Sequence, residues 1–167
     1  MKQPLTPHDM LRRVLRVARF DGMSVLVIAG AFAVISGAAG DFSGAVFGAA
    51  IAAAGAIELR GASLLRSSNR QGMGWLVGSQ LYLMAVVLGY VGFRIANLAS
   101  DPLLKAVTKA MATTGMEVDE MIDLPQLLRL GYLAVAAVTV VYQGGMAFYY
   151  LRRRAVVMAA LQEDDTP

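Results

Sequence analysis

Four stretches of this chain carry no charged residue over a length that matters for a membrane, and they constrain its fold most. They cover residues 22–40, 42–57, 71–93 and 130–151. A helix needs about 20 mostly apolar residues to cross a hydrocarbon core about 30 Å thick. The second stretch is long enough only if its helix continues through Glu58 and Arg60 to Leu65. We expect that continuation, because residues 55–65 contain no proline and the apolar pattern resumes at Leu59.

The composition indicates that lipid surrounds much of the chain. Of its 167 residues 57% are apolar and 16% are charged, and the mean hydropathy is +0.56, far from the average of soluble domains. The predicted fold is therefore all-α, an integral membrane four-helix bundle with four transmembrane helices. Its predicted segments are an N-terminal amphipathic interfacial helix at 9–20, spans at 22–40, 42–65, 71–94 and 125–151, a helical extracytoplasmic connection at 95–124, and a tail at 152–167.

Lysine and arginine near the ends of the spans predict the orientation. With four crossings, the N-terminal segment, the second connection and the tail lie on one side. The basic residues of these three segments are Lys2, Arg12, Arg13, Arg16, Arg19, Arg66, Arg70, Arg152, Arg153 and Arg154. We expect both termini to be cytoplasmic in a multi-pass protein of the plasma (inner) membrane.

The segment before the first span is predicted to be an amphipathic helix that Asp9 caps. Leu11, Val14 and Ala18 share one of its faces, and arginines occupy much of the rest. The pattern fits a helix on an anionic lipid surface, but a simple topology signal would require the same arginines. The residues predicted to contact anionic lipids on the cytoplasmic side are Arg12, Arg13, Arg16, Arg19, Arg152, Arg153 and Arg154.

Small residues form stripes on the second and third spans, where they let another helix approach closely. The stripes are Gly44, Gly48, Ala52 and Gly55, and then Gly74, Gly78, Ala85, Gly89 and Gly92. The pattern favours packing within the bundle, and a subunit interface is the alternative. Because four short spans can leave one stripe uncovered, we also expect a homo-oligomer, and another membrane protein is a further possible partner.

The pair Glu58 and Arg60 interrupts the second apolar stretch near its predicted cytoplasmic end. At about 1.5 Å per residue, Arg60 lies level with Asp21 on the first helix, and Glu58 lies about 3 Å shallower. Ion pairs between Asp21 and Arg60 and between Glu58 and Arg19 are therefore expected. Such groups form either an inter-helix clamp or part of an ion or proton path.

Two glutamines are predicted at matching depth on the third and fourth spans. Gln80 and Gln143 lie about 13 Å and 12 Å from the cytoplasmic ends of their helices, and Tyr142 is adjacent to Gln143. Hydrogen bonds between helices explain such a polar layer. A cavity that holds water or a polar solute is the alternative, because Gln80 points away from the glycine stripe of its own helix.

The third connection is too long for a plain loop. A helix is predicted to begin at Pro102, capped by Ser100 or Asp101, and to end at Gly115. A second short helix brings three acidic residues to one side, as a solvated face or as a cation-attracting outer cluster. That cluster comprises Asp119, Glu120 and Asp123.

The residue inventory excludes several classes of function. The chain has no cysteine and one histidine, His8, so zinc and haem sites built on these residues are not expected, and no metal or other cofactor is predicted. No nucleophile–base pattern or phosphate-binding glycine loop indicates an enzyme, and a lipid-modifying enzyme is the third-ranked alternative. No aromatic platform accompanies the arginines, so nucleic acid is not a predicted partner.

The predicted function is a small channel or transport component for an ion or polar solute, and the alternative is a non-catalytic membrane subunit that binds lipid or a partner membrane protein.

Overall fold

The computed structural model describes residues 6–114 and 123–163, and these residues form helices joined by short turns. The elements in chain order are α1 Pro7–Ala38, α2 Phe42–Arg66, α3 Gly72–Ala96, the 3-10 turn η1 Leu98–Ser100, α4 Pro102–Thr114 and α5 Leu124–Glu163. The predicted all-α fold is thus confirmed, and so is the helix that begins at Pro102.

Four of these helices, α1, α2, α3 and α5, are long and apolar enough to cross a membrane. The helices α2 and α3 have 25 residues each, which corresponds to about 38 Å at 1.5 Å per residue. The predicted continuation of the second span is confirmed, because α2 runs through Glu58 and Arg60 without a break and ends at Arg66.

Local sequence explains where α1 and α2 begin and end. The Oγ1 atom of Thr6 accepts a hydrogen bond from the Asp9 backbone N–H at 3.2 Å, so Thr6 caps α1, whereas Asp9 was predicted to be the cap. Gly40 has a φ of +78° in the turn after α1, a conformation that favours glycine. Asp41 then caps α2, since its Oδ1 atom accepts a hydrogen bond from the Gly44 N–H at 3.0 Å.

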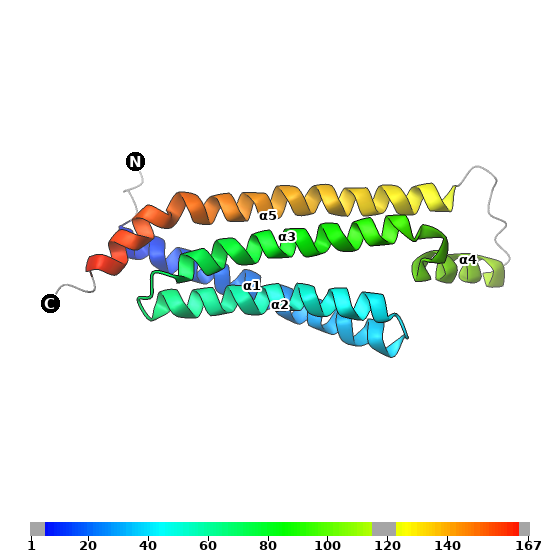
Figure 1. Cartoon of the computed structure of the whole chain (residues 1–167), viewed down its shortest axis with the longest axis horizontal. Coiled ribbons are helices and arrows are strands. Elements are labelled where there is room, and N and C mark those ends of the chain that lie inside the picture. Colours follow the sequence, from blue (N-terminus) through cyan, green and yellow to red (C-terminus); the bar gives the residue numbers. More distant parts are fainter. Residues whose placement is uncertain (1–5, 115–122, 164–167) are drawn as a thin grey trace.

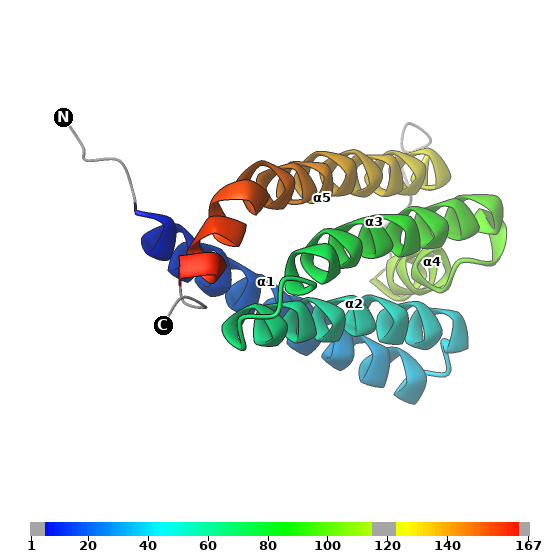
Figure 2. The same cartoon turned by 60° about the vertical axis from the view of Figure 1, so that its left-hand side comes forward.

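The four long helices run alternately up and down (Figure 1). Helix α2 packs between α1 and α3, and α5 packs along α3. Helix α1 approaches α5 where α1 begins and α5 ends, and the two helices diverge towards their other ends (Figures 1 and 2). We call the end where α1 begins and α5 ends the basic end, and the opposite end, which carries α4, the α4 end.

The main hydrophobic core lies at the basic end, where all four long helices meet. Val14 and Ala18 of α1, Leu76 of α3 and Tyr150 of α5 are fully buried there. The segment predicted as an interfacial helix at 9–20 and the predicted first span form one continuous helix, α1. The apolar face of its first turns packs against α5 instead of lying on lipid, since the end of α5 supplies Val157 and other apolar partners.

The two glycine stripes have different surroundings. On α2, a Cβ atom added to Gly55 would lie 2.5 Å from the Gly22 carbonyl oxygen, and one added to Gly48 would lie 2.9 Å from Ala33 Cα. These glycines therefore allow α1 and α2 to approach closely, as predicted. On α3, a Cβ atom added to Gly74 or Gly78 would meet no described atom within 4 Å, and the same holds for Gly89 and Gly92. The prediction that this stripe packs within the bundle is wrong for these four glycines, because the stripe faces outward.

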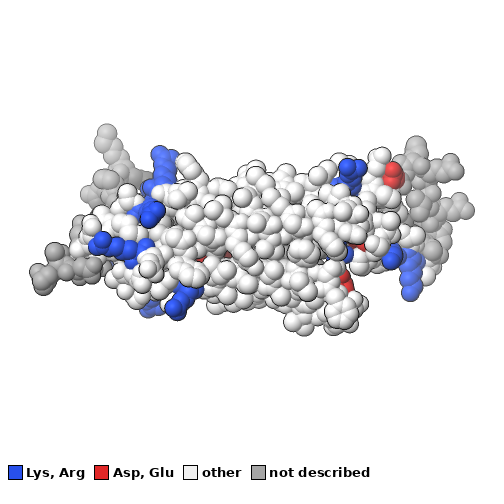
Figure 3. Space-filling view, viewed as in Figure 1, with Lys and Arg blue, Asp and Glu red and all other residues white. Residues whose placement is uncertain are grey.

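The outer surface of the bundle is apolar between two charged ends. Lysine and arginine gather at the two ends, and the middle of the face in Figure 3 is almost free of charge. Large apolar side chains such as Ile28 of α1 and Val138 and Val141 of α5 are exposed, and they lie well inside their helices. The distribution matches helices whose middle parts face hydrocarbon and whose ends face water.

Candidate functional site

Two carboxylates, which we call the acidic pair, meet inside the bundle. Asp21 of α1 is 8% exposed and Glu58 of α2 is 1% exposed. The close contact between Gly22 and Gly55 brings the two helices together beside them. A Cβ atom added to Gly22, the residue after Asp21, would lie 3.3 Å from Glu58 Cβ, so the two carboxylates lie close together.

Neutral donors from α3 and α5 surround the acidic pair. The Nε2 atom of Gln80 donates to Asp21 Oδ2 at 3.1 Å, and the Tyr142 hydroxyl donates to Asp21 Oδ1 at 3.0 Å. The Tyr150 hydroxyl donates to Glu58 Oε1 at 2.6 Å. Side chains of all four long helices thus converge on the same two carboxyl groups.

The ion pairs predicted for the two carboxylates are wrong. Among the described residues, neither Arg19 nor Arg60 lies within ion-pair distance of Asp21 or Glu58, and both arginines are exposed. Arg60 is two positions after Glu58, so it projects about 200° further around the helix, away from the interior. The charges of the acidic pair are therefore not offset by either arginine.

Two buried amide oxygens beside the acidic pair lack a donor. Gln80 is 1% exposed and Gln143 is 8% exposed, and the Oε1 atom of each finds no hydrogen-bond partner among the described residues. Buried acceptors without donors are uncommon in proteins. We call Asp21, Glu58, Gln80, Tyr142, Gln143 and Tyr150 the inner polar cluster, which contains more acceptors than donors.

A groove of about 410 Å³ adjoins the inner polar cluster where α1 and α5 diverge. Gln143 lines it from α5, and Ser24, one helical turn after Asp21, lines it from α1. The remaining lining residues are apolar and come from α1, α2 and α3. The cluster therefore lies next to a surface groove, and Tyr142 is itself 51% exposed.

Sequence analysis predicted most of the inner polar cluster, but as two separate groups. It placed Asp21 and Glu58 in a clamp near the membrane surface and the two glutamines in a deeper layer. The structure joins them at one level of the bundle. Glu58 and Gln80 are each eight residues from the basic end of their helices, about 12 Å in both cases. Tyr150 was missed, since aromatic residues near the end of a span are also typical of membrane interfaces.

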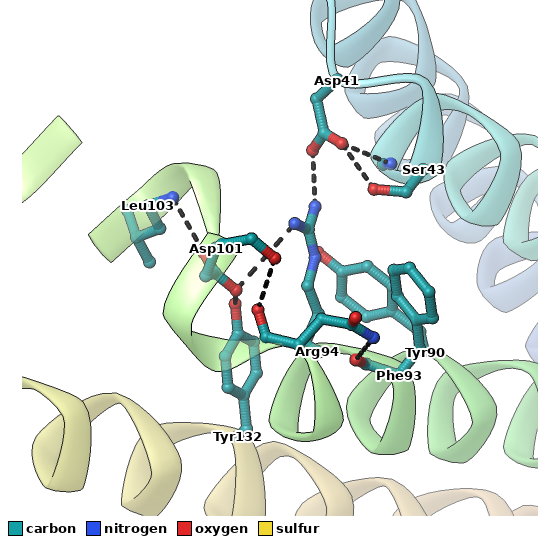
Figure 4. Close-up of polar contacts among 11 residues, drawn as sticks. Asp41, Ser43, Tyr90, Phe93, Arg94, Asp101, Leu103 and Tyr132 are labelled. Atoms are coloured by element: carbon teal, nitrogen blue, oxygen red, sulfur yellow. Dashed lines mark hydrogen bonds and ion pairs between the residues drawn. The ribbon is translucent and has the colours of Figure 1, made fainter. Parts of the chain in front are cut away.

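A second polar cluster, the Arg94 clamp, lies at the α4 end (Figure 4). The Arg94 Nη2 atom lies 2.5 Å from Asp41 Oδ2, and its Nη1 atom lies 3.9 Å from Asp101 Oδ2. The Nε atom of Arg94 donates to the Tyr90 hydroxyl at 3.0 Å. The guanidinium group thus lies between two carboxylates, one in the turn before α2 and one before α4.

Further donors complete the Arg94 clamp. Asp41 accepts from the Ser43 hydroxyl at 2.7 Å, and Asp101 accepts from the Leu103 N–H at 2.8 Å and the Tyr132 hydroxyl at 2.7 Å. Burial tends to raise the pKa of Asp41, but the hydrogen bonds from Ser43, the Gly44 N–H and Arg94 outweigh it and hold that pKa below its ordinary value. Sequence analysis assigned no site to these residues. A single arginine after a charge-free stretch, with aspartates expected at the same end of the bundle, was the available signal.

The other predicted site residues that the structure describes lie at the two ends of the bundle. Asp119 and Glu120 of the predicted outer cluster lie outside the described residues, as does the second short helix. Asp123 is exposed, and its Oδ1 atom accepts from the Gln126 N–H at 3.1 Å at the start of α5. Of the arginines predicted to contact anionic lipids, six are exposed at the basic end and Arg153 is half-buried. The exposed ones are Arg12, Arg13, Arg16 and Arg19 of α1 and Arg152 and Arg154 of α5.

The structure thus defines a helical bundle with four helices that could span a membrane and a buried acidic pair between them. Comparisons with models of protein families, with curated proteins and with solved structures found no match to this chain.

Proposed function

We propose that this chain is a multi-pass protein of the plasma (inner) membrane, with its basic end on the cytoplasmic side. Four helices of sufficient length and an apolar middle surface support the spanning arrangement. The arginines of the basic end support this orientation, because basic residues in short connections near the ends of spans favour the cytoplasmic side. Arg12, Arg16, Arg66 and Arg152 are all exposed there.

Within that membrane, the chain acts as a transport component for a small cation, and the acidic pair is the group that binds and releases it. The observation that carries this proposal is the burial of Asp21 and Glu58 together, with the neutral hydrogen-bond donors Gln80, Tyr142 and Tyr150 around them. Ionisable groups inside membrane bundles are costly and often mark ion or proton pathways. The proposal assigns the chain no enzymatic activity.

A proton is the cation that the acidic pair fits best. Two adjacent carboxylates in a medium of low polarity repel each other, and one proton held between them removes that repulsion. A proton needs no space between the two groups, whereas a metal cation does. Tyr142, Tyr150 and Gln80 hold the carboxyl groups in place while the shared proton is exchanged. The unpartnered oxygens of Gln80 and Gln143 offer further acceptors for a proton carried by water.

A flux assay tests this function directly. The purified full chain is reconstituted into vesicles that contain a pH-sensitive dye. A pH gradient is then imposed together with a potassium diffusion potential. We expect the parent to dissipate the gradient and Glu58→Gln and Asp21→Asn to abolish that activity. Asp9→Asn is the matched control, since it makes the same chemical change at an exposed position, and it should retain full flux. Equal flux in Glu58→Gln and the parent would overturn the role of the pair.

Infrared spectroscopy separates a proton from a metal cation. A protonated carboxyl group has a C=O stretching band that an ionised one lacks. We expect the parent at neutral pH to show such a band and Glu58→Gln to lose it, while Asp9→Asn keeps it. A fully ionised pair whose carboxylate bands shift on addition of sodium would replace the proton with a metal cation.

A non-catalytic membrane subunit, alone or as a homo-oligomer, is the second candidate function. It is favoured by the outward glycine stripe of α3 and by α5, because residues 124–142 of α5 include no fully buried residue. Faces of this kind accept a partner helix in lipid. Absence of flux for every cation tested, with the chain folded and assembled with itself or with another membrane protein, would support this candidate and overturn the first.

A further inference from the structure

A groove of about 520 Å³ opens on the outer face of the bundle at its basic end, away from the inner polar cluster. Gly74, Gly78 and Trp75 of α3 form one wall, and Ile57 of α2 lies opposite. A Cβ atom added to either glycine would meet no described atom within 4 Å, so no other part of the described chain covers this wall. From Gly74 to Gly78 the wall is apolar over about one helical turn.

Two arginines that are distant in sequence meet at this groove. Arg70 comes from the turn between α2 and α3, and Arg154 comes from α5. Gln71 lies with them and adds an amide donor. Guanidinium groups recognise phosphate oxygens with paired hydrogen bonds, so this part of the groove suits a phosphate group.

The order of these groups along α3 matches the order of groups in a phospholipid. The arginines and Gln71 lie at the end of the bundle, where the headgroup layer would be. Trp75 is 45% exposed and comes next, and amphipathic indole rings favour this level of a membrane. Gly78 lies one turn deeper, where an acyl chain can run along the exposed helix surface.

We propose that this groove binds one anionic phospholipid, with its phosphate on Arg70 and Arg154 and one acyl chain along Gly74 and Gly78. The proposal rests on the membrane-spanning part of the proposed function and is independent of proton transport. Basic pockets between helices on the cytoplasmic side are typical sites for anionic headgroups. The groove therefore selects a lipid by its charge and holds it at one position.

Trp75 provides a direct probe, because it is the only tryptophan of the chain. The full chain is reconstituted into phosphatidylcholine vesicles in which a small fraction of lipid carries brominated acyl chains, which quench indole fluorescence on contact. We expect brominated phosphatidylglycerol to quench Trp75 at a lower mole fraction than brominated phosphatidylcholine. Each arginine should raise the preference for phosphatidylglycerol over phosphatidylcholine about five-fold.

Two pairs of variants locate the site. Arg70→Gln with Arg154→Gln should abolish the preference, whereas Arg66→Gln, at an exposed arginine of the basic end outside the groove, should retain it. Gly78→Leu should reduce quenching by both lipids, whereas Gly89→Leu, on the same uncovered stripe but outside the groove, should not.

Several results would overturn the lipid site. Equal quenching by the two lipids in the parent, or an unchanged preference in the double arginine variant, would exclude a selective site. Loss of the preference on addition of inorganic phosphate would assign the groove to free phosphate. Absence of quenching by either lipid would contradict the membrane-spanning arrangement itself, whereas loss of proton flux alone would leave the lipid site intact.

Discussion

The two polar clusters of this bundle use similar residues but differ in how their charges are offset. In the Arg94 clamp a guanidinium group lies between Asp41 and Asp101. In the inner polar cluster Asp21 and Glu58 lie close together, and their hydrogen-bond donors Gln80, Tyr142 and Tyr150 are neutral. Both sites are buried and both join several helices, so burial alone does not distinguish a structural site from a functional one.

The charge balance of each cluster, more than its number of hydrogen bonds, distinguishes a structural role from a role in cation exchange. An arginine, a backbone N–H and a hydroxyl stabilise the ionised form of a carboxylate, so it stays ionised near neutral pH. A buried carboxylate next to another carboxylate gains from taking up a cation. The Arg94 clamp therefore fits a structural role, and the acidic pair fits a role in cation exchange.

Removal of the guanidinium group should have the largest effect. Arg94→Met leaves Asp41 and Asp101 near each other without their shared cation, so the free energy of unfolding should fall by about 3 kcal/mol. Arg94→Lys keeps the charge but loses the fork geometry and should cost less. Equilibrium unfolding in mixed detergent micelles, followed by helical ellipticity, measures both. Stability of Arg94→Met equal to that of the parent would remove the distinction between the two clusters.

Acid should weaken the Arg94 clamp by a smaller amount. The pKa of Asp41 lies below its ordinary value of 3.8 in the folded chain, so the folded state binds fewer protons than the unfolded state near that pH. The stabilisation is present above pH 3.8 and is lost as the pH falls through the lowered pKa. Unfolding measured across this range should show the loss in the parent and a flatter curve in Asp41→Asn. An equal slope in both would contradict the assignment.

Neutralisation of the acidic pair should change stability in the opposite direction. Glu58→Gln replaces a carboxyl group that must share a proton with Asp21 by a neutral amide, and it keeps an acceptor for the Tyr150 hydroxyl. The free energy of unfolding should therefore stay unchanged or rise by about 1 kcal/mol. The micelle unfolding assay applies here as well, with Asp41→Asn as the matched change in the other cluster, where a loss is expected. A large loss in Glu58→Gln would indicate that Glu58 serves a structural ion pair.

Single hydroxyl groups should have the smallest effects. Tyr132→Phe removes a donor from Asp101 in the Arg94 clamp and should cost about 1 kcal/mol. Tyr142→Phe removes a donor from Asp21, but that carboxyl group can take up a proton instead, so the cost should be smaller. A larger cost at Tyr142 than at Tyr132 would reverse the comparison.

Sequence reasoning predicted five of the six residues of the inner polar cluster, because polar residues inside long apolar stretches stand out and helix geometry gives their depth. It could not predict which of them touch. Asp21 was assigned to Arg60, but the Gly22–Gly55 contact sets the rotation of α1 against α2 and turns Arg60 outward. Arg94 was missed because an arginine at the end of a span is ordinary by sequence alone.

The sequence by itself determined that this chain forms long apolar helices with short turns between them, since hydrophobic length, caps such as Asp41 and the turn at Gly40 are local properties. Only the tertiary structure decided which glycine stripe is covered, which carboxylates meet and which arginine holds the α4 end together. Those outcomes depend on how each helix is rotated and shifted against its neighbours. That rotation is set by the packing of all four helices at once, and no single segment contains it.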